Sequence, residues 1–321
     1  MSDPKILTLI VGPPAAGKST HATAYANSYN ATILSRDETG GTIQSLVPKL
    51  EALLQEGRSV VLDNTNLTKE MRRPFIECAQ RNDAQVHILL IESTIENCQI
   101  NALRRMWATH GRLYLGPNGA PRSDPHTFPV AALFSARKIY EKPGPDEATK
   151  IIKPLVYKEE WADKALSAPA LFLDIDGTLR ETEHLEHKYP LKPAEVVLIK
   201  PVEILRAAID AYRGQGYKII GISNQSGITK GTLTEQDAEA CFDRTRELLG
   251  FTADEFPIMY CPHRSAPISC YCRKPQSGLF VKAALTYDIN IPKSIMVGDL
   301  KTDETAAQRL GMRFIHASKF V

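Results

Sequence analysis

The stretch GPPAAGKST, from Gly12 to Thr20, fits the phosphate-binding pattern GxxxxGK[ST] and directly follows an apolar run. Glycines in such a loop let the backbone turn tightly, so that its N–H groups point at phosphate oxygens. The lysine reaches the β- and γ-phosphates, and the hydroxyl that follows it suits Mg²⁺. We therefore expect a site for ATP, or another NTP, with Mg²⁺, formed by Gly12, Gly17, Lys18, Ser19 and Thr20. A chance Gly-Lys-Ser turn is the alternative.

Acidic and basic residues at later positions supply other groups that phosphoryl transfer needs. Asp37, in SRDE, could accept the proton of an attacking hydroxyl, or could instead cap the next helix. Asp63, in DNTN, occupies the place of a Walker-B-like acid that helps to hold the Mg²⁺ water shell. Arg104 and Arg105 could close over the γ-phosphate and stabilise its developing charge, or could lie on a solvated helix face. This set of residues predicts a kinase.

Taken together, GPPAAGKST, SRDE, DNTN and the paired arginines resemble the kinase domain of polynucleotide kinase–phosphatases over roughly residues 5–157. The resemblance implies that the loop binds ATP·Mg and that Asp37 is the general base for a 5′-hydroxyl. It also implies one lid arginine, for which we favour Arg105 over Arg104. One position departs from the pattern. Phage-type members have an arginine three residues after the base, which grips the acceptor's phosphate, whereas this chain has Gly40.

The stretch LFLDIDGTL, from Leu171 to Leu179, places two carboxylates, Asp174 and Asp176, at the end of a second apolar run. This DxDGT pattern resembles the first motif of the haloacid-dehalogenase (HAD) phosphatases. The resemblance implies that Asp174 is the nucleophile that forms an aspartyl-phosphate. It implies that Asp176 protonates the leaving oxygen and later activates water.

The partners of this motif follow in the expected order. Ser223, in ISNQ, offers a hydroxyl to the phosphoryl oxygens, and Lys274, in CRKP, offsets negative charge. Asp299, in VGDLKTDE, is a hard oxygen ligand for Mg²⁺, and Asp303 could orient Lys274 or the waters of the metal. The candidate Mg²⁺ ligands are therefore Asp174, Asp176, Asp299 and Asp303. A degenerate, inactive remnant is the alternative.

The segment CPHRSAPISCYC brings Cys261, His263, Cys270 and Cys272 together in a C-x-H-x6-C-x-C pattern. One histidine and three thiolates make the closed tetrahedral set of a structural Zn²⁺ site, whereas three buried thiols that happen to cluster are the alternative. The pattern resembles the zinc loop of histidinol-phosphate and heptose-bisphosphate phosphatases, where the loop walls one side of the substrate pocket. Phage polynucleotide phosphatase domains lack this loop, so the second half of the chain combines features of two substrate classes.

Two series of alternating strands and helices must position these residues. In the first half we expect strands at Lys5–Val11, Thr32–Ser35, Ser59–Asp63, Val86–Glu92 and Lys150–Tyr157, and helices near Thr42–Gln55, Thr68–Asn82 and Thr94–His110. In the second half we expect strands at Leu171–Asp174, Lys218–Ser223, Pro257–Tyr260, Ser294–Val297 and Arg313–His316. A Gly- and Pro-rich loop is expected at Gly111–His126, and a joint between domains at residues 158–168.

Such alternation predicts an α/β fold with two doubly wound parallel sheets. We expect a P-loop kinase domain over residues 1–160 and a HAD-like Rossmannoid phosphatase domain over residues 161–321. Most of the chemical residues lie at or just after strand ends, which is where open parallel sheets bind ligands.

The composition suits an ordinary soluble protein of two domains, with 321 residues, 43% hydrophobic and 24% charged residues and a net charge of +2. No apolar run reaches about 18 residues and no secretory signal is visible, so we expect no membrane span and a cytoplasmic protein. The balanced charge lacks the basic bias of proteins that coat nucleic acid non-specifically, but it leaves a local basic groove open.

Three functions are open at this stage. The first is end healing, in which a 5′-hydroxyl kinase and a 3′-phosphatase act on DNA or RNA ends that a ligase then joins. The second is a bifunctional kinase and phosphatase for small sugar or nucleoside metabolites, which the zinc loop and the near-neutral charge favour. The third is a non-catalytic nucleotide-sensing module, which the full set of catalytic residue types argues against.

Overall fold

The computed structural model describes residues 4–117, 124, 127–154 and 168–320 of the chain. The chain divides into two compact units, one formed by Met1–Ala102 with Pro121–Glu159 and the other by Leu103–Ala120 with Glu160–Val321. Helix α5 (Ile95–His110) therefore begins in the first unit and ends in the second. Almost all of the expected joint at residues 158–168, and part of the expected loop at Gly111–His126, lie outside the described residues.

Five parallel strands form the sheet of the first unit, in the order β2-β3-β1-β4-β5. They are β1 (Ile6–Val11), β2 (Thr32–Ser35), β3 (Val60–Asp63), β4 (Gln85–Leu90) and β5 (Lys150–Ile152). The inner strands are almost wholly buried, as apolar runs must be when helices cover both faces of a parallel sheet. The expected strands are confirmed, although the last three residues expected for β5 lie outside the described part.

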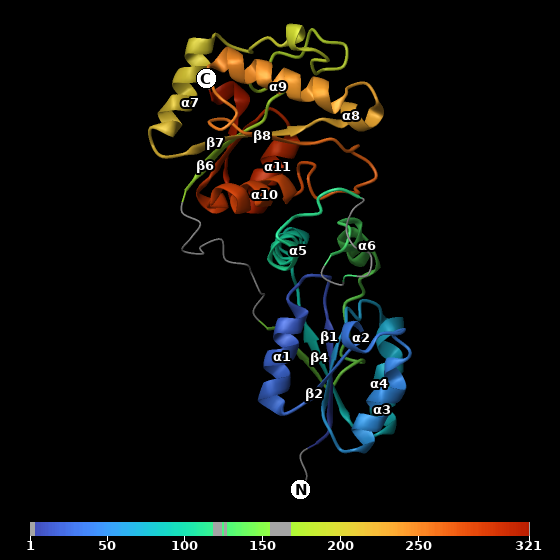
Figure 1. Ribbon diagram of the computed structural model, residues 1–321. Coiled ribbons are helices and arrows are strands. Elements are labelled where there is room, and N and C mark those ends of the chain that lie inside the picture. Colours follow the sequence, from blue (N-terminus) through green and yellow to red (C-terminus); the bar gives the residue numbers. More distant parts are fainter. Residues whose placement is uncertain (1–3, 118–123, 125–126, 155–167, 321) are drawn as a thin grey trace. The chain divides into compact units, whose positions relative to one another are not determined.

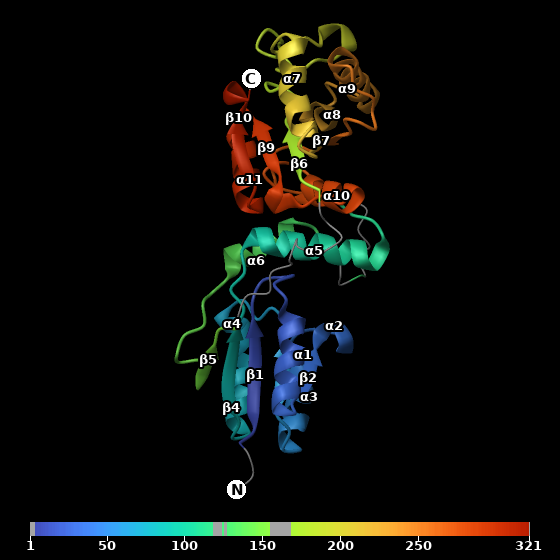
Figure 2. The same ribbon diagram turned by 90° about the vertical axis from the view of Figure 1, so that its left-hand side faces the viewer.

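Helices cover both faces of this sheet (Figure 1). Helix α1 (Lys18–Tyr29) lies on one face, and α3 (Leu46–Gln55) and α4 (Lys69–Arg81) lie on the other. Leu46, Leu50 and Leu54 are fully buried, because a spacing of four residues lines up one side of α3. Helix α1 was not among the expected ranges. Two further unexpected helices, α2 (Arg36–Thr39) and α6 (Ala131–Ile139), lie beyond the carboxyl ends of the strands (Figures 1 and 2).

The second unit holds another sheet of five parallel strands, in the order β10-β9-β6-β7-β8. They are β6 (Ala170–Leu173), β7 (Lys218–Asn224), β8 (Ile258–Cys261), β9 (Ile295–Gly298) and β10 (Arg313–His316), which confirms the expected strands. Both sheets are thus parallel and doubly wound, and the expected α/β fold class is confirmed.

Helices α7 (Val202–Arg213) and α9 (Glu235–Leu249) cover one face of this sheet, and α10 (Gly278–Tyr287) and α11 (Lys301–Leu310) cover the other (Figure 1). The short helix α8 (Ser226–Lys230) follows β7. Between β6 and α7 the chain forms one 3-10 turn at Pro193–Glu195 and no cap domain. Among the described residues, no helix is both long and apolar enough to span a membrane.

Candidate active sites

The loop between β1 and α1 is built around two glycines. Gly17 has a φ of 86°, in the left-handed region that favours glycine, and Lys18 begins α1 directly after it. A Cβ atom on Gly12 would lie 2.9 Å from the carbonyl oxygen of Ile91, so a side chain there would push the loop away from the residue that follows β4. The first N–H groups of α1 face the loop, which is the arrangement that binds phosphate.

Three side chains of this loop, Lys18, Ser19 and Thr20, lie in the first turn of α1. The Lys18 ammonium donates to the carbonyl oxygen of Pro13 at 2.8 Å, a position from which it can turn to a phosphate. Ser19 and Thr20 are exposed in the first turn of α1. The amide of Asn101, on α5, donates to the carbonyl oxygen of Ala15 at 2.9 Å and so fastens that helix to the loop. The sequence carried no signal for this role of Asn101.

The DNTN segment is fastened to the same loop. Asp63 ends β3, next to β1 in the sheet, and its Walker-B-like role stays a prediction. The buried side chain of Asn66 donates to the carbonyl oxygen of Ile10 at 2.8 Å, and the N–H of Gly12 donates to the carbonyl oxygen of Thr65 at 3.2 Å. These bonds fix the distance between the DNTN segment and the P-loop.

A buried ion pair between Arg72 and Glu147 also contacts Asn66. The guanidinium of Arg72, which is fully buried, donates to the carbonyl oxygen of Asn66 at 3.0 Å and makes two bonds, at 2.6 and 2.9 Å, with the carboxylate of Glu147. Sequence reasoning missed both residues, because an arginine in an amphipathic helix is expected on the surface. Only the packing of α4 against its neighbours shows the role of Arg72.

Asp37 is not a helix cap. Ser35 is the N-cap of α2, and its side chain accepts a hydrogen bond from the N–H of Asp37 at 3.2 Å, so the capping alternative for Asp37 is wrong. The carboxylate of Asp37 is 61% exposed and lies 3.7 Å from the guanidinium of Arg36. A side chain so placed is accessible to an acceptor hydroxyl. Its role as general base stays a prediction.

Arg104 and Arg105 lie half-buried in α5, in the part of that helix that belongs to the second unit. Both take part in interactions with other groups. The role of a lid arginine stays a prediction.

Lys274 is the centre of the second candidate site. Its ammonium lies 2.5 Å from the Asp174 carboxylate and 2.7 Å from that of Asp303, and donates to the carbonyl oxygen of Ile222 at 2.7 Å. All three charged side chains are at most 7% exposed. Burial raises the pKa of Asp174 to about 8, against the opposing effect of Lys274. Burial also works to lower the pKa of Lys274, but the two carboxylates outweigh it and raise that pKa.

Three carboxylates converge beside Lys274. Asp174, Asp299 and Asp303 each place an oxygen within 4.8 Å of the others, and Oδ1 of Asp299 is buried without a hydrogen-bond partner among the described residues. Burial, together with the nearby Asp303, raises the pKa of Asp299. A Cβ atom on Gly177 would lie 2.4 Å from Oδ2 of Asp299, so this position must be glycine. The residues fit a hard divalent cation such as Mg²⁺.

The carboxylate of Asp176 lies outside this group of three carboxylates and faces other partners. Arg180 approaches its Oδ1 at 2.7 Å, and the amide of Gln225 donates to its Oδ2 at 2.7 Å and to the hydroxyl of Ser223 at 2.8 Å. The structure thus links two predicted residues, Asp176 and Ser223, through Gln225. Neither Arg180 nor Gln225 was predicted, although both stand in the segments that carry the predicted residues.

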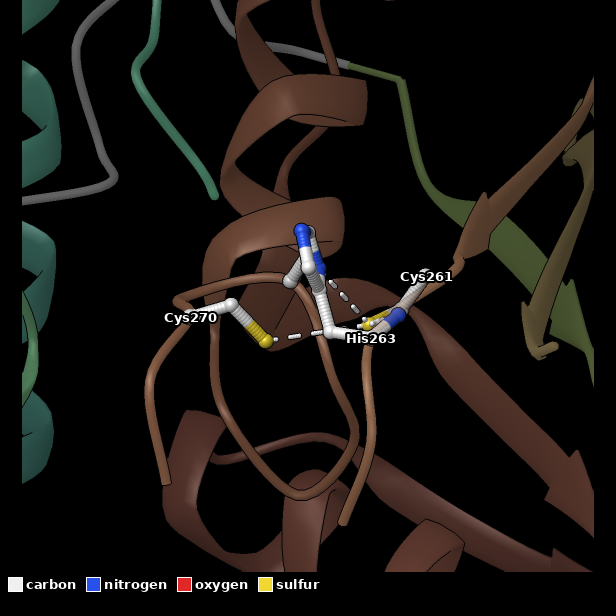
Figure 3. Close-up of side chains that lie close together, drawn as sticks. Cys261, His263 and Cys270 are labelled. Carbon is white, nitrogen blue, oxygen red and sulfur yellow. Dashed lines mark hydrogen bonds between the residues drawn. The ribbon is translucent and has the colours of Figure 1, made fainter. Parts of the chain in front are cut away.

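The four residues of the cysteine loop converge as expected. Figure 3 shows three of them, Cys261, His263 and Cys270. Sγ of Cys261 lies 3.7 Å from that of Cys270 and 3.5 Å from Nδ1 of His263, which lies 3.2 Å from Sγ of Cys272. Zn–S bonds of about 2.3 Å in a tetrahedron imply S···S edges of about 3.8 Å. All three cysteines are free and buried. The four side chains could hold a zinc ion in a closed site, and the zinc site stays a prediction.

Two protein-family models match separate stretches of the chain. A family model described as an AAA domain matches residues 7–110, and one described as HAD-hydrolase-like matches residues 271–317. The chain is 34% identical over 148 residues to the probable D-glycero-D-manno-heptose-1,7-bisphosphate 7-phosphatase of Thermoplasma volcanium, which covers 45% of this chain and 94% of that protein.

Two solved structures show weaker likeness. The D,D-heptose 1,7-bisphosphate phosphatase from B. bronchiseptica, complexed with magnesium and phosphate, is 25% identical with a TM-score of 0.39 and covers 46% of this chain and 78% of its own. A fungal RNA kinase is 12% identical with a TM-score of 0.36 and covers 78% of this chain and 100% of its own. Neither TM-score is high enough to inform function.

The fold, the two sites and the family matches define an enzyme with a kinase domain followed by a HAD-like phosphatase domain. Through the match that spans 94% of the Thermoplasma protein, the chain belongs to the phosphatase family that includes the D-glycero-D-manno-heptose-1,7-bisphosphate 7-phosphatases. That match leaves more than half of this chain uncovered, so the family alone does not account for the kinase domain.

Proposed function

We propose that this enzyme heals nucleic-acid ends: it transfers the γ-phosphate of ATP to a 5′-hydroxyl and removes a 3′-phosphate. The observation that supports this most directly is the exposure of Asp37 in the kinase site, where its carboxylate is 61% exposed. In the second unit, residues 174–201 between β6 and α7 contain one 3-10 turn and no cap domain. A polymer end needs such an open approach, whereas enzymes for small esters commonly close over their substrates.

In the kinase site, the loop N–H groups and Lys18 would hold the phosphates of ATP. Asp37 takes the proton of the 5′-hydroxyl as that oxygen attacks the γ-phosphorus, and the bond from this phosphorus to the ADP oxygen breaks. Mg²⁺ bound with the nucleotide would supply charge neutralisation, and Ser19 and Asp63 would hold it. Arg104 or Arg105 would offset charge on the transferred group.

In the phosphatase site, an oxygen of Asp174 attacks the phosphorus of the 3′-phosphate while the bond to the sugar oxygen breaks. Asp176 gives that oxygen a proton, which yields a 3′-hydroxyl. Asp176 then takes a proton from water as the water oxygen attacks the aspartyl-phosphate, and inorganic phosphate and free Asp174 result. Lys274 neutralises charge on the phosphoryl group. Mg²⁺, held by Asp174, Asp299 and Asp303, would supply further positive charge there.

A second function has support of its own. The relative that shares 34% identity is named as a heptose bisphosphate phosphatase, and the four-ligand loop, which we propose binds zinc, resembles that of such enzymes. The phosphatase domain would then act on a small sugar phosphate, and the kinase domain on a hydroxyl of a related sugar or nucleoside.

One comparison of substrates separates the two functions. The purified protein with Mg²⁺ and ATP is offered DNA and RNA oligonucleotides with a 3′-phosphate and a 5′-hydroxyl, and separately heptose 1,7-bisphosphate and free sugars. End healing predicts a higher kcat/KM for one or both oligonucleotides than for heptose 1,7-bisphosphate and the free sugars. Turnover on the sugars alone would replace the proposal with the metabolite function.

A further inference from the structure

A cavity of about 530 Å³ lies in the first unit, directly beside the P-loop. Pro13, whose carbonyl oxygen accepts the hydrogen bond from Lys18, forms part of its wall. The other walls come from Leu67 after β3, from Ile91 and the residues that lead into α5, and from α6. A ligand that fills the cavity would therefore adjoin the site of phosphoryl transfer.

One side of α6 faces this cavity. Leu133, Ala136, Arg137 and Tyr140 follow one another at intervals of three, one and three residues, which places them on the same side of a helical turn. Leu133 and Ala136 are at most 4% exposed, as are Leu67 and Ile91 on the opposite walls. Tyr140 is 36% exposed, so its ring is accessible to a ligand.

Hydrogen bonds fix these walls in place without any ligand. The N–H of Glu141 donates to the carbonyl oxygen of Leu67 at 2.9 Å, which joins the end of α6 to the segment after β3. The N–H of Ile91 donates to the carbonyl oxygen of Val11 at 2.8 Å, which joins the third wall to β1. The cavity is thus preformed, and its volume is ordinary for a small-ligand site.

The chemistry of the lining selects the kind of ligand. A sugar needs hydrogen-bond partners on every side, whereas most of these walls are apolar and the polar groups come from residues 92–96 and Arg137. A heteroaromatic ring has two apolar faces and a polar edge, and it stacks well on apolar and aromatic side chains. A nucleobase therefore suits this cavity better than a sugar.

We propose that the cavity binds a nucleobase, and that the nucleotide carrying it reaches the P-loop with its phosphate or its 5′-hydroxyl. This inference rests on the proposed kinase function and names a subsite for it. The base belongs either to the donor ATP or to the acceptor end of a polynucleotide, and the two sources share the same recognition chemistry.

The test fills the cavity. In Ala136→Trp the indole has to enter the cavity, because residue 136 is almost fully buried. Ser135→Trp is the matched control on the same helix, since the side chain at position 135 is exposed. Remaining phosphate transfer to the abasic acceptor checks that the kinase unit of each variant is folded. Tyr140→Ala, at a surface position, removes the aromatic wall without enlarging any side chain. The acceptors are an oligonucleotide with a 5′-hydroxyl and the same oligonucleotide with an abasic 5′-terminal residue.

If the cavity takes the acceptor base, Ala136→Trp and Tyr140→Ala raise the KM for the normal oligonucleotide about tenfold and leave that for the abasic one unchanged. If it takes the donor base, the same variants raise the KM for ATP instead. Both results support the inference. Unchanged KM values for ATP and acceptor, in variants that still transfer phosphate, would overturn it.

If the proposed kinase function is wrong, the unsubstituted enzyme does not phosphorylate the 5′-hydroxyl at all, which is a separate result. Calorimetric titration of ATP into the same variants then decides the inference. Weaker binding of ATP, or of the 5′-hydroxyl oligonucleotide titrated in the same way, by Ala136→Trp than by Ser135→Trp supports a base in the cavity. Equal binding of both ligands by the two variants contradicts it.

Discussion

Lys274 illustrates how single side chains determine the chemistry of the phosphatase site. It lies between Asp174 and Asp303, with all three side chains buried. Lys274→Met would leave two carboxylates without their cation, at a position where positive charge should stabilise the transferred phosphoryl group. We expect the phosphatase rate to fall about 10²–10³-fold or more. Lys301→Met, which changes a lysine that is 77% exposed, should leave the rate unchanged. Equal rates for both variants would remove Lys274 from the mechanism.

The same cluster predicts a pH dependence. Burial raises the pKa of Asp174 from 3.8 to about 8 in the metal-free protein, so the folded state keeps a proton that the unfolded chain releases. The free energy of unfolding should therefore fall as the pH rises from about 4 through about 8. Mg²⁺ must displace this proton, so its affinity should rise with pH over the same range. Denaturant titrations with and without Mg²⁺ measure both effects. Asp174→Asn should remove the pH dependence of both the free energy of unfolding and the Mg²⁺ affinity. An unchanged pH dependence in that variant would mean that another group titrates.

Among the elements, α4 positions the kinase site through one ion pair. Arg72→Met leaves Glu147 buried without its partner, and loss of a buried partner costs about 3–5 kcal/mol of the free energy of unfolding. Arg73→Met, on the same helix but 68% exposed, should change that free energy by less than about 0.5 kcal/mol. Removing both partners in Arg72→Met with Glu147→Leu should recover part of the loss. Denaturant unfolding measures all three, and a loss for Arg72→Met no larger than for Arg73→Met would refute the role of the pair.

The cysteine loop makes a separate prediction at the level of elements. Metal analysis of the purified protein should find about one zinc ion per chain. Cys270→Ser should lose that ion and lower the thermal midpoint of the phosphatase domain. Cys241→Ser, which changes a buried cysteine outside the loop, should keep it. Protein that contains no zinc, and Cys270→Ser with an unchanged midpoint, would show that the four residues only pack together.

The sequence was sufficient to predict both sheets and the positions of the chemical residues at strand ends. Apolar runs that end in Gly12, Asp63 or Asp174 identify buried parallel strands, and motif spacing identifies the cysteine loop. The groups that orient these residues could not be predicted. Arg72 looks like a surface residue until α4 is packed, and the pairing of Asp176 with Arg180 depends on the turn after β6.

At the scale of the whole molecule, the position of a segment along the chain did not predict the unit with which it packs. Leu103–Ala120 precedes the expected boundary at residue 160 but packs with the second unit, where the carbonyl oxygen of Leu115 accepts from the N–H of Tyr271 at 2.8 Å. Such a contact depends on long-range packing, for which no local pattern exists. The arginines that we expect to act in the kinase reaction lie in this segment.

We propose that two independent sites on one chain perform opposite phosphate chemistry at nucleic-acid ends. The most direct measurement follows one oligonucleotide, with a 5′-hydroxyl and a 3′-phosphate, by mass spectrometry after incubation with Mg²⁺ and ATP. We expect the unsubstituted enzyme to add a 5′-phosphate and remove the 3′-phosphate. Lys18→Ala should abolish only the first change, and Asp174→Asn only the second. An oligonucleotide left unaltered at both ends, by an enzyme that does turn over small phosphate esters, would contradict the account.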